Sequence, residues 1–317
     1  MDNFYEPVIV VSKCLGLDLC RYDGQMINNN FIKRLDAYAK IIPVCPEVEI
    51  GLGVPRPKIK LVQTDKKVKV VQRETNQNLQ EQLKNFSQNF LQKKVNEVDG
   101  FILKSHSPSC GMKDCKIYNN PEDIKPAGRE SGIFAKEAQK FFPEVIKINE
   151  IKLKKRKYKR QFLTHIFIRA HFRALTEKQQ LSSLIKFHSE NKFLLQAHNE
   201  KLMRQMGSLT ANPNHLNLRE IFNNYEKLLN RNLNSQATRK SHINVLSHCF
   251  GFISDNLTAE DKKKFESVLS QYRTQKTGLN KVKKILYNWL KKYGSSYIIN
   301  QTYFNPFPSQ LLNSDND

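Results

Sequence analysis

Three of the six cysteines lie where their thiols could act together. Cys14, Cys45 and Cys110 each end or closely follow a short apolar run, and the loop around each one contains Pro or Gly. Such loops are stiff and let backbone amides approach a sulfur atom. Three thiolates that meet in a dry pocket suit an iron–sulfur cluster with one iron left open, or a zinc ion with one open position. Since no compact Cys-x-x-Cys pair is present, only the fold could bring these thiols together.

The first half of the chain alternates strand and helix patterns. Short β-branched runs at 7–12, 41–45, 100–105 and 145–149 predict strands, and apolar residues at helical spacing predict a helix over 74–95. This alternation predicts an α/β domain with a mostly parallel sheet. The carboxyl ends of parallel strands lie at one edge, where ligand sites form. The three cysteines could therefore meet there, although 31 and 65 residues separate them.

Other interpretations of the cysteines stay open. Small buried cysteines often pack at strand ends without binding anything. Cys20 and Cys115 could complete a four-thiolate zinc site with Cys14 and Cys110, although separations of six and five residues are unusual for zinc. Cys249 lies inside a helical run and is expected in the core.

The second half of the chain predicts an all-α domain. Helical patterns cover about 159–175, 177–205, 215–232, 235–255, 258–274 and 278–302. We expect a boundary near the basic run 152–157, which gives an N-terminal domain over 1–152 and a helical domain over 153–317.

Charge is distributed unevenly between the two halves. The 317 residues carry a net charge of +22, of which +4 falls on 1–150 and +18 on 151–317. A basic module beside a nearly neutral one indicates that the basic half holds a polyanion while the nearly neutral half has a different role. Nucleic acid is the favoured polyanion, a membrane surface is second, and simple solubility is the alternative. Without a long apolar run or a signal-like N-terminus, we expect a cytoplasmic protein with no membrane partner.

The basic residues expected to contact RNA lie in the helical half, interleaved with aromatic residues. Each of them taken singly could instead be a solvated surface charge, whereas the collective excess is harder to explain in that way. The candidates are Arg169, Arg173, Lys192, Arg204, Arg239, Lys240 and Arg273.

Several segments resemble the thiouracil desulfidase (TudS) family, and the second half resembles the YbgA-type domain. The first resemblance is carried by Ser12-Lys-Cys14-Leu, Arg21-Tyr-Asp-Gly24, Pro43-Val-Cys45-Pro-Glu47, Gly51-Leu-Gly-Val-Pro-Arg-Pro57 and Ser107-Pro-Ser-Cys110-Gly111. The second is carried by Phe187-His188, Lys192, Ala197-His198, Arg239, His242-x-Asn244-x-x-x-His248 and Tyr272-Arg273. The tandem arrangement is similar to RudS-type proteins, which remove sulfur from 4-thiouridine in tRNA.

The resemblance implies a cofactor and a set of site residues. It implies a 4Fe-4S cluster bound by the three cysteines named first, with its fourth iron free to take sulfur. It also implies catalytic roles for Glu47 and Ser107, with Ser109 as the less favoured serine. The alternative for Glu47 is a surface carboxylate paired with Arg21 or Arg56. One departure is the order Cys-Leu-Gly-Leu at 14–17, where the family usually has Cys-Leu-Leu-Gly, so Gly16 predicts a first loop of different shape.

Three functions remain possible at this point. The first is an enzyme that converts 4-thiouridine in tRNA to uridine with release of hydrosulfide, which makes tRNA the partner. The second is a desulfidase of free thiouracil or thiouridine, and the third is a non-enzymatic, metal-stabilised RNA-binding protein. A Walker-type loop and a Ser-Gly-Gly-x-Asp-Ser loop are both missing, which favours sulfur removal over ATP-dependent sulfur insertion.

Overall fold

The computed structural model describes residues 4–64, 67–95, 97–211 and 215–312. These divide into two compact units, a first unit of residues 4–170 with 309–312 and a second unit of residues 171–308. The boundary expected after residue 152 stays a prediction. Within the described ranges, no helix is both long enough and apolar enough to cross a membrane.

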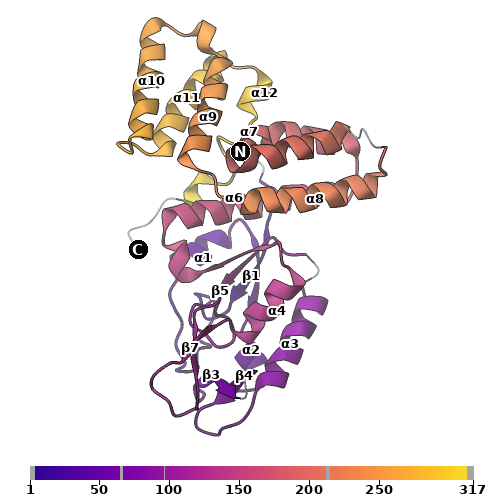
Figure 1. Ribbon diagram of the computed structural model, residues 1–317, viewed down its shortest axis with the longest axis vertical. Coiled ribbons are helices and arrows are strands. Elements are labelled where there is room, and N and C mark those ends of the chain that lie inside the picture. Colours follow the sequence, from indigo (N-terminus) through magenta and orange to yellow (C-terminus); the bar gives the residue numbers. More distant parts are fainter. Residues whose placement is uncertain (1–3, 65–66, 96, 212–214, 313–317) are drawn as a thin grey trace. The chain divides into compact units, whose positions relative to one another are not determined.

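The four strands predicted from apolar runs form one sheet in the first unit (Figure 1). Its order is β2 (Lys40–Val44), β1 (Val8–Ser12), β5 (Gly100–Leu103) and β8 (Ile146–Asn149), and every neighbouring pair is parallel. The fold class expected for this half is therefore confirmed. Parallel strands covered on both faces read as continuous apolar runs, which is why the sequence showed them clearly.

A second sheet was not predicted. It has the order β4 (Lys67–Gln72), β3 (Ile59–Thr64), β6 (Cys115–Tyr118) and β7 (Gly128–Glu130). β3 pairs antiparallel with β4 and parallel with β6, and β6 pairs antiparallel with β7. Residues 74–79, which were expected to begin a helix, lie before α3 (Gln80–Lys93), and Asn78 forms a bridge to Val71.

Helices cover both faces of the first sheet. α3 and α4 (Ile133–Phe141) lie side by side (Figure 1), and their apolar side chains pack on β1, β2 and β5 in a cluster that includes Phe101 and Phe134. On the opposite face, α6 (Arg156–Thr176) lies so close to Gly100 that a Cβ there would be 2.7 Å from Ile166. Short helices α1 (Asn30–Leu35), α2 (Pro46–Glu49) and α5 (Glu150–Leu153) complete this unit.

The second unit is helical, as the sequence predicted. After the end of α6 come α7 (Leu181–Ala211), α8 (Leu218–Asn234), α9 (Arg239–Gly251), α10 (Ala259–Arg273), α11 (Leu279–Tyr293) and α12 (Ser296–Ile299). Asn199 has non-helical dihedral angles and kinks α7. Part of the core is aromatic, because the rings of Phe172 and Tyr225 stack with centroids 5.5 Å apart.

Candidate active site

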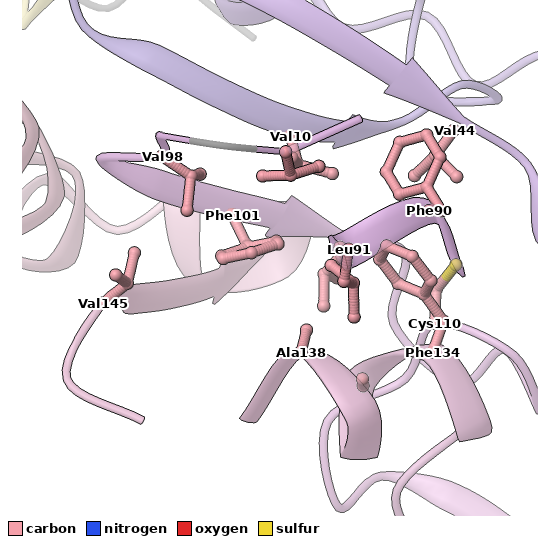
Figure 2. Close-up of a cluster of buried hydrophobic side chains, with 13 residues drawn as sticks. Val10, Val44, Phe90, Leu91, Val98, Phe101, Cys110, Phe134, Ala138 and Val145 are labelled. Atoms are coloured by element: carbon pink, nitrogen blue, oxygen red, sulfur yellow. The ribbon is translucent and has the colours of Figure 1, made fainter. Parts of the chain in front are cut away.

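Three of the five cysteines of the first unit, Cys14, Cys45 and Cys110, follow three neighbouring strands of the parallel sheet. Cys14 comes after β1 and is half-buried, Cys45 follows β2 as the residue before α2, and Cys110 comes after β5. Cys45 and Cys110 are buried, and Figure 2 shows the Cys110 sulfur at the end of the apolar cluster beside the rings of Phe90 and Phe134. The topology thus places all three residues at one edge of the sheet.

A fourth thiol also lies at this edge. Cys20 is buried, and the Cys45 thiol donates to its backbone carbonyl at 3.8 Å. The interaction with Cys14, together with burial, raises the pKa of Cys20 to about 11. Burial raises the pKa of Cys110, and the negative charges of Cys45 and Glu47 raise it further. These buried thiols would ionise only beside a positive group such as a bound metal.

The donor set fits a cluster better than a single ion. The described residues contain no group of three or more His, Cys, Asp or Glu side chains placed to hold one metal ion. Cys115 does not join the others in a zinc site, because its Sγ donates to the Ser107 carbonyl at 2.8 Å. In a cluster each thiolate binds a different iron, so the sulfurs need not converge on one point, and an all-sulfur set is what such clusters take. Cys14, Cys45 and Cys110 are therefore suitable ligands.

Glu47 lies on α2, two residues after Cys45, and is held from two sides. Its Oε1 accepts a hydrogen bond from Ser109 Oγ at 2.8 Å, and its Oε2 lies 2.9 Å from the Arg56 guanidinium. The Glu47 side chain is only 13% exposed. It is therefore a half-buried carboxylate: its partner is Arg56, one of the two that the alternative named, but it does not lie on the surface as that alternative assumed, and Arg21 pairs with Asp23.

The two serines of the third loop point to different partners. Ser107 Oγ accepts hydrogen bonds from the backbone N–H groups of Ser109 and Cys110, at 3.3 and 3.2 Å. Ser109, which is completely buried, is the serine that contacts Glu47. The sequence placed Ser107 first, whereas the contacts place Ser109 nearer to the carboxylate.

Two glycines allow the third loop to fold against the start of α4. A Cβ on Gly132 would lie 2.4 to 2.7 Å from backbone atoms of Pro108 and Ser109, and a Cβ on Gly111 would lie 2.3 Å from Cys115 Sγ. This close approach lets the Ser109 carbonyl accept from the N–H groups of Phe134 and Ala135. Because these helix-start N–H groups lack partners within the helix, the loop caps the helix while the helix fixes the loop.

A buried ion pair holds the chain just before the third loop. Glu150 accepts from Lys104 Nζ at 2.7 Å, and from the backbone N–H and Oγ of Ser105 at 2.8 and 2.6 Å. Although burial opposes ionisation, these hydrogen bonds lower the pKa of Glu150.

At the first loop, Gly16 has φ +90°, so the displaced glycine occupies a backbone conformation that favours glycine.

Five of the seven basic residues predicted to contact RNA line two adjoining cavities in the second unit. One cavity, of about 870 Å³, is lined by Arg239, Lys240 and Arg273, and the other, of about 540 Å³, by Lys192 and Arg204. Gln196 and Glu200 line both cavities.

The cations around the two cavities differ in their partners. Arg204 pairs with Glu200 at 2.7 Å, while no ion pair found in the described residues involves the three cations of the larger cavity. The remaining candidates, Arg169 and Arg173, lie on α6 and line neither cavity; Arg169 donates to the Val98 carbonyl at 3.5 Å.

Some residues at this site carried no separate signal in the sequence. Arg56 was considered as a possible partner of a surface carboxylate and as part of the segment Gly51 to Pro57 that carries the family resemblance, but no role was assigned to it; Cys20 was considered only as part of a zinc site. Their contacts depend on how three loops pack at the edge of the sheet. The one available hint was that Arg56 lies in a segment dense in Gly and Pro, where the backbone is constrained.

Comparison with known proteins matches the two parts of the chain separately. Residues 9–150 match the family model described as 2-thiouracil desulfurase, and residues 192–308 match a family described as a protein of unknown function, DUF1722. Neither match spans half of the chain. A solved structure entitled [4Fe-4S]-dependent thiouracil desulfidase TudS is 26% identical, covers 47% of this chain and 94% of that chain, and has a TM-score of 0.37. No curated protein matches the chain.

Proposed function

We propose that this protein is an iron–sulfur-dependent desulfidase that converts 4-thiouridine in tRNA to uridine. The reaction replaces the sulfur at C4 by the oxygen of water and releases hydrosulfide and a proton. The observation that carries the proposal is the meeting of Glu47, Ser109 and the cysteine loops at one edge of the parallel sheet. The match of residues 9–150 to 2-thiouracil desulfurases supports a desulfidase enzyme.

The expected 4Fe-4S cluster is consistent with the donor set of the site. Cys14, Cys45 and Cys110 would hold it, and when bound it would supply an electrophilic iron that polarises the thiocarbonyl group. The neighbouring chain supplies the polar groups. Glu47 presents a carboxylate that can accept a proton from the attacking water, and Ser109 orients that carboxylate. Ser107 holds the backbone around Cys110.

The identity of the substrate as tRNA is supported by charge. The larger cavity of the second unit gathers three cations for which no ion pair is found among the described residues, with Glu200 as the acidic residue of its lining, and the net charge of +18 on residues 151–317 exceeds what a small neutral base requires. Phosphate contacts of this kind supply most sequence-independent affinity for nucleic acid. They would also offset the cost of exposing a thiolated base from folded RNA, which is a few kcal/mol.

A desulfuration assay tests the chemistry. Anaerobically reconstituted protein is incubated with bulk tRNA that contains 4-thiouridine, and the thiocarbonyl absorbance is followed. We expect the absorbance band to disappear with the unaltered chain and to persist with Cys110→Ala. With Cys249→Ala, which alters a cysteine buried in the helical unit, the band should disappear as fast as with the unaltered chain. Glu47→Asp should keep the iron content but slow the reaction. A stable band with full iron content would refute the proposed reaction.

A salt titration tests the partner. Binding to tRNA should weaken as salt rises, with a log–log slope of roughly 0.7–0.9 for each phosphate contact. Reversing charge in the larger cavity with Lys240→Glu and Arg273→Glu should lower both the affinity and the slope. Lys140→Glu on α4 is the matched control, because it makes the same charge reversal at an exposed position in the first unit.

The free base is the second candidate substrate, because the matched family is described by 2-thiouracil. If the charge-reversed variants turn over tRNA as fast as the unaltered chain, the cavity does not hold the RNA. Turnover of free thiouracil by a chain that leaves thiolated tRNA unchanged would make the small molecule the substrate.

A further inference from the structure

We propose that Arg56 is a positioning residue of this site, which fixes the Glu47 carboxylate against the Cys45 sulfur. The inference rests on the proposed function and adds a residue to it. Arg56 is 7% exposed and follows the turn at 51–55. A guanidinium keeps its positive charge in proteins, so a buried one must find partners for its N–H groups.

The partners of Arg56 belong to three separate loops. Its Nε donates to Glu47 Oε2 at 2.9 Å, and its Nη2 lies 2.9 Å from the same oxygen in the ion pair. Its Nη1 donates to the carbonyl oxygens of Cys20 and Gly53, both at 3.0 Å. Its Nη2 also lies 3.9 Å from Cys45 Sγ, within the range of a hydrogen bond to sulfur. One planar group therefore joins the loop after β1, the residues at the start of α2 and the turn at 51–55.

The pairing engages the two oxygens of Glu47 unequally. A carboxylate oxygen has about two lone-pair sites. Oε2 accepts a hydrogen bond from Arg56 Nε and lies 2.9 Å from the charged Nη2, while the one hydrogen bond to Oε1 found among the described residues comes from Ser109 Oγ. Water or substrate can therefore meet Glu47 at Oε1. Arg56 and Ser109 together set the direction in which that oxygen faces.

Arg56 also acts on one of the expected cluster ligands. A cationic N–H group directed at the Cys45 sulfur stabilises negative charge on it, and hydrogen bonds to ligand sulfurs are among the factors that set cluster potentials. The reduced cluster carries more negative charge than the oxidised one, so Arg56 should raise the reduction potential. Lysine cannot reproduce this arrangement, because its single nitrogen lacks the planar fork that reaches carboxylate, carbonyls and sulfur together.

The test compares Arg56→Gln and Arg56→Lys with Arg73→Gln, which removes an exposed arginine of the same unit. Each variant is reconstituted anaerobically, and the midpoint potential, kcat and KM are measured. We expect Arg56→Gln to lower kcat by about 10- to 100-fold, as outer-shell substitutions at metal sites do, and to make the potential more negative. Arg56→Lys should restore part of the potential but little of kcat, and Arg73→Gln should match the unaltered chain.

The outcomes separate this inference from the proposed function. If the unaltered chain has no desulfidase activity, the proposed function fails, while the potentials still report whether Arg56 acts on the cluster. If activity is present and Arg56→Gln leaves both kcat and the potential unchanged, the inference is overturned. Should Arg56→Gln fail to fold, Arg56→Lys decides, because it keeps the buried charge: unaltered kcat and potential in that variant would overturn the inference.

Discussion

Replacing Gly132 by alanine should damage the candidate site without replacing any residue placed in its chemistry. Gly132 precedes α4, and its N–H donates to the Gly111 carbonyl at 2.8 Å. The added Cβ would lie 2.4 Å from the Ser109 carbonyl carbon and 2.5 Å from its oxygen. Contacts of a Cβ under 3.0 Å are essentially never seen, and these atoms are main chain, so a side-chain rotation cannot relieve them. The loop from Ser107 to Cys110 must move by several tenths of an ångström.

The expected size of the effect follows from this displacement. Overpacking costs about 1–3 kcal/mol, which is less than the stability of a typical domain, so the chain should stay folded. In a unit of this size, that cost lowers the melting temperature by roughly 2–12 °C. The same shift moves Ser109 and Cys110 together. Misplacement approaching 1 Å costs on the order of 100-fold in rate, so we expect a loss of roughly 10- to 100-fold.

Calorimetry and the anaerobic desulfuration assay measure the two effects on one preparation. Gly251→Ala is the matched control, because a Cβ at Gly251 meets nothing within 4 Å and alanine suits the end of a helix. That variant should keep its activity and melt at the same or a slightly higher temperature. A Gly132→Ala chain with unaltered melting temperature, iron content and rate would show that the loop does not depend on its contact with α4.

Three further outcomes follow from the structure. Ser109→Ala should lower kcat while the iron content is retained, because it removes the hydrogen bond to Glu47. Ser107→Ala should lower the iron content first, because it removes the acceptor of the Cys110 N–H group. Iron analysis together with kinetics distinguishes these two outcomes. Burial, assisted by a neighbouring lysine, lowers the pKa of His188 to about 4 from 6.5, so the unfolded chain binds this proton more readily than the folded one. Stability should therefore fall as the pH drops from about 6.5 toward 4, by on the order of 3 kcal/mol, and denaturant unfolding should show a flatter dependence in His188→Gln. Chelation of iron should abolish desulfuration yet leave the affinity for tRNA unchanged in a binding assay, because the cations of the larger cavity are in the second unit.

The parallel sheet could be predicted because its two central strands, β1 and β5, are buried on both faces. Residues 8–12 and 100–103 are almost entirely apolar, and the sequence marks them as strands without knowledge of their neighbours. The second sheet gives a different signal. β3 begins with isoleucine, lysine and leucine, and β4 begins with two alternations of lysine and valine, so each strand carries only a short stretch of the period-two pattern of a half-exposed hairpin. β7 has only three residues, and so short a strand carries no recognisable pattern.

The placement of the cysteines could be predicted from topology, but their partners could not. A residue that follows a parallel strand must lie at the carboxyl edge of the sheet, whatever the loop does next. The choice between Ser107 and Ser109 depends on a turn through Pro108, which directs one hydroxyl to backbone N–H groups and the other to Glu47. Only Pro108 lies between these serines, and residues two positions apart in a loop have no periodicity that distinguishes their directions.

The polar groups of the site are ordered by backbone contacts as much as by side chains. Arg56 binds two carbonyl oxygens besides Glu47, and Glu150 accepts a backbone N–H of Ser105. Loops of this kind have no ladder of hydrogen bonds, so buried side chains must satisfy their backbone groups. A substitution of Arg56 or Glu150 therefore removes hydrogen bonds that hold the backbone of these loops, in addition to removing a charge. For that reason the cluster potential, which responds to the charge near Cys45, is a more specific measure of Arg56 than activity alone.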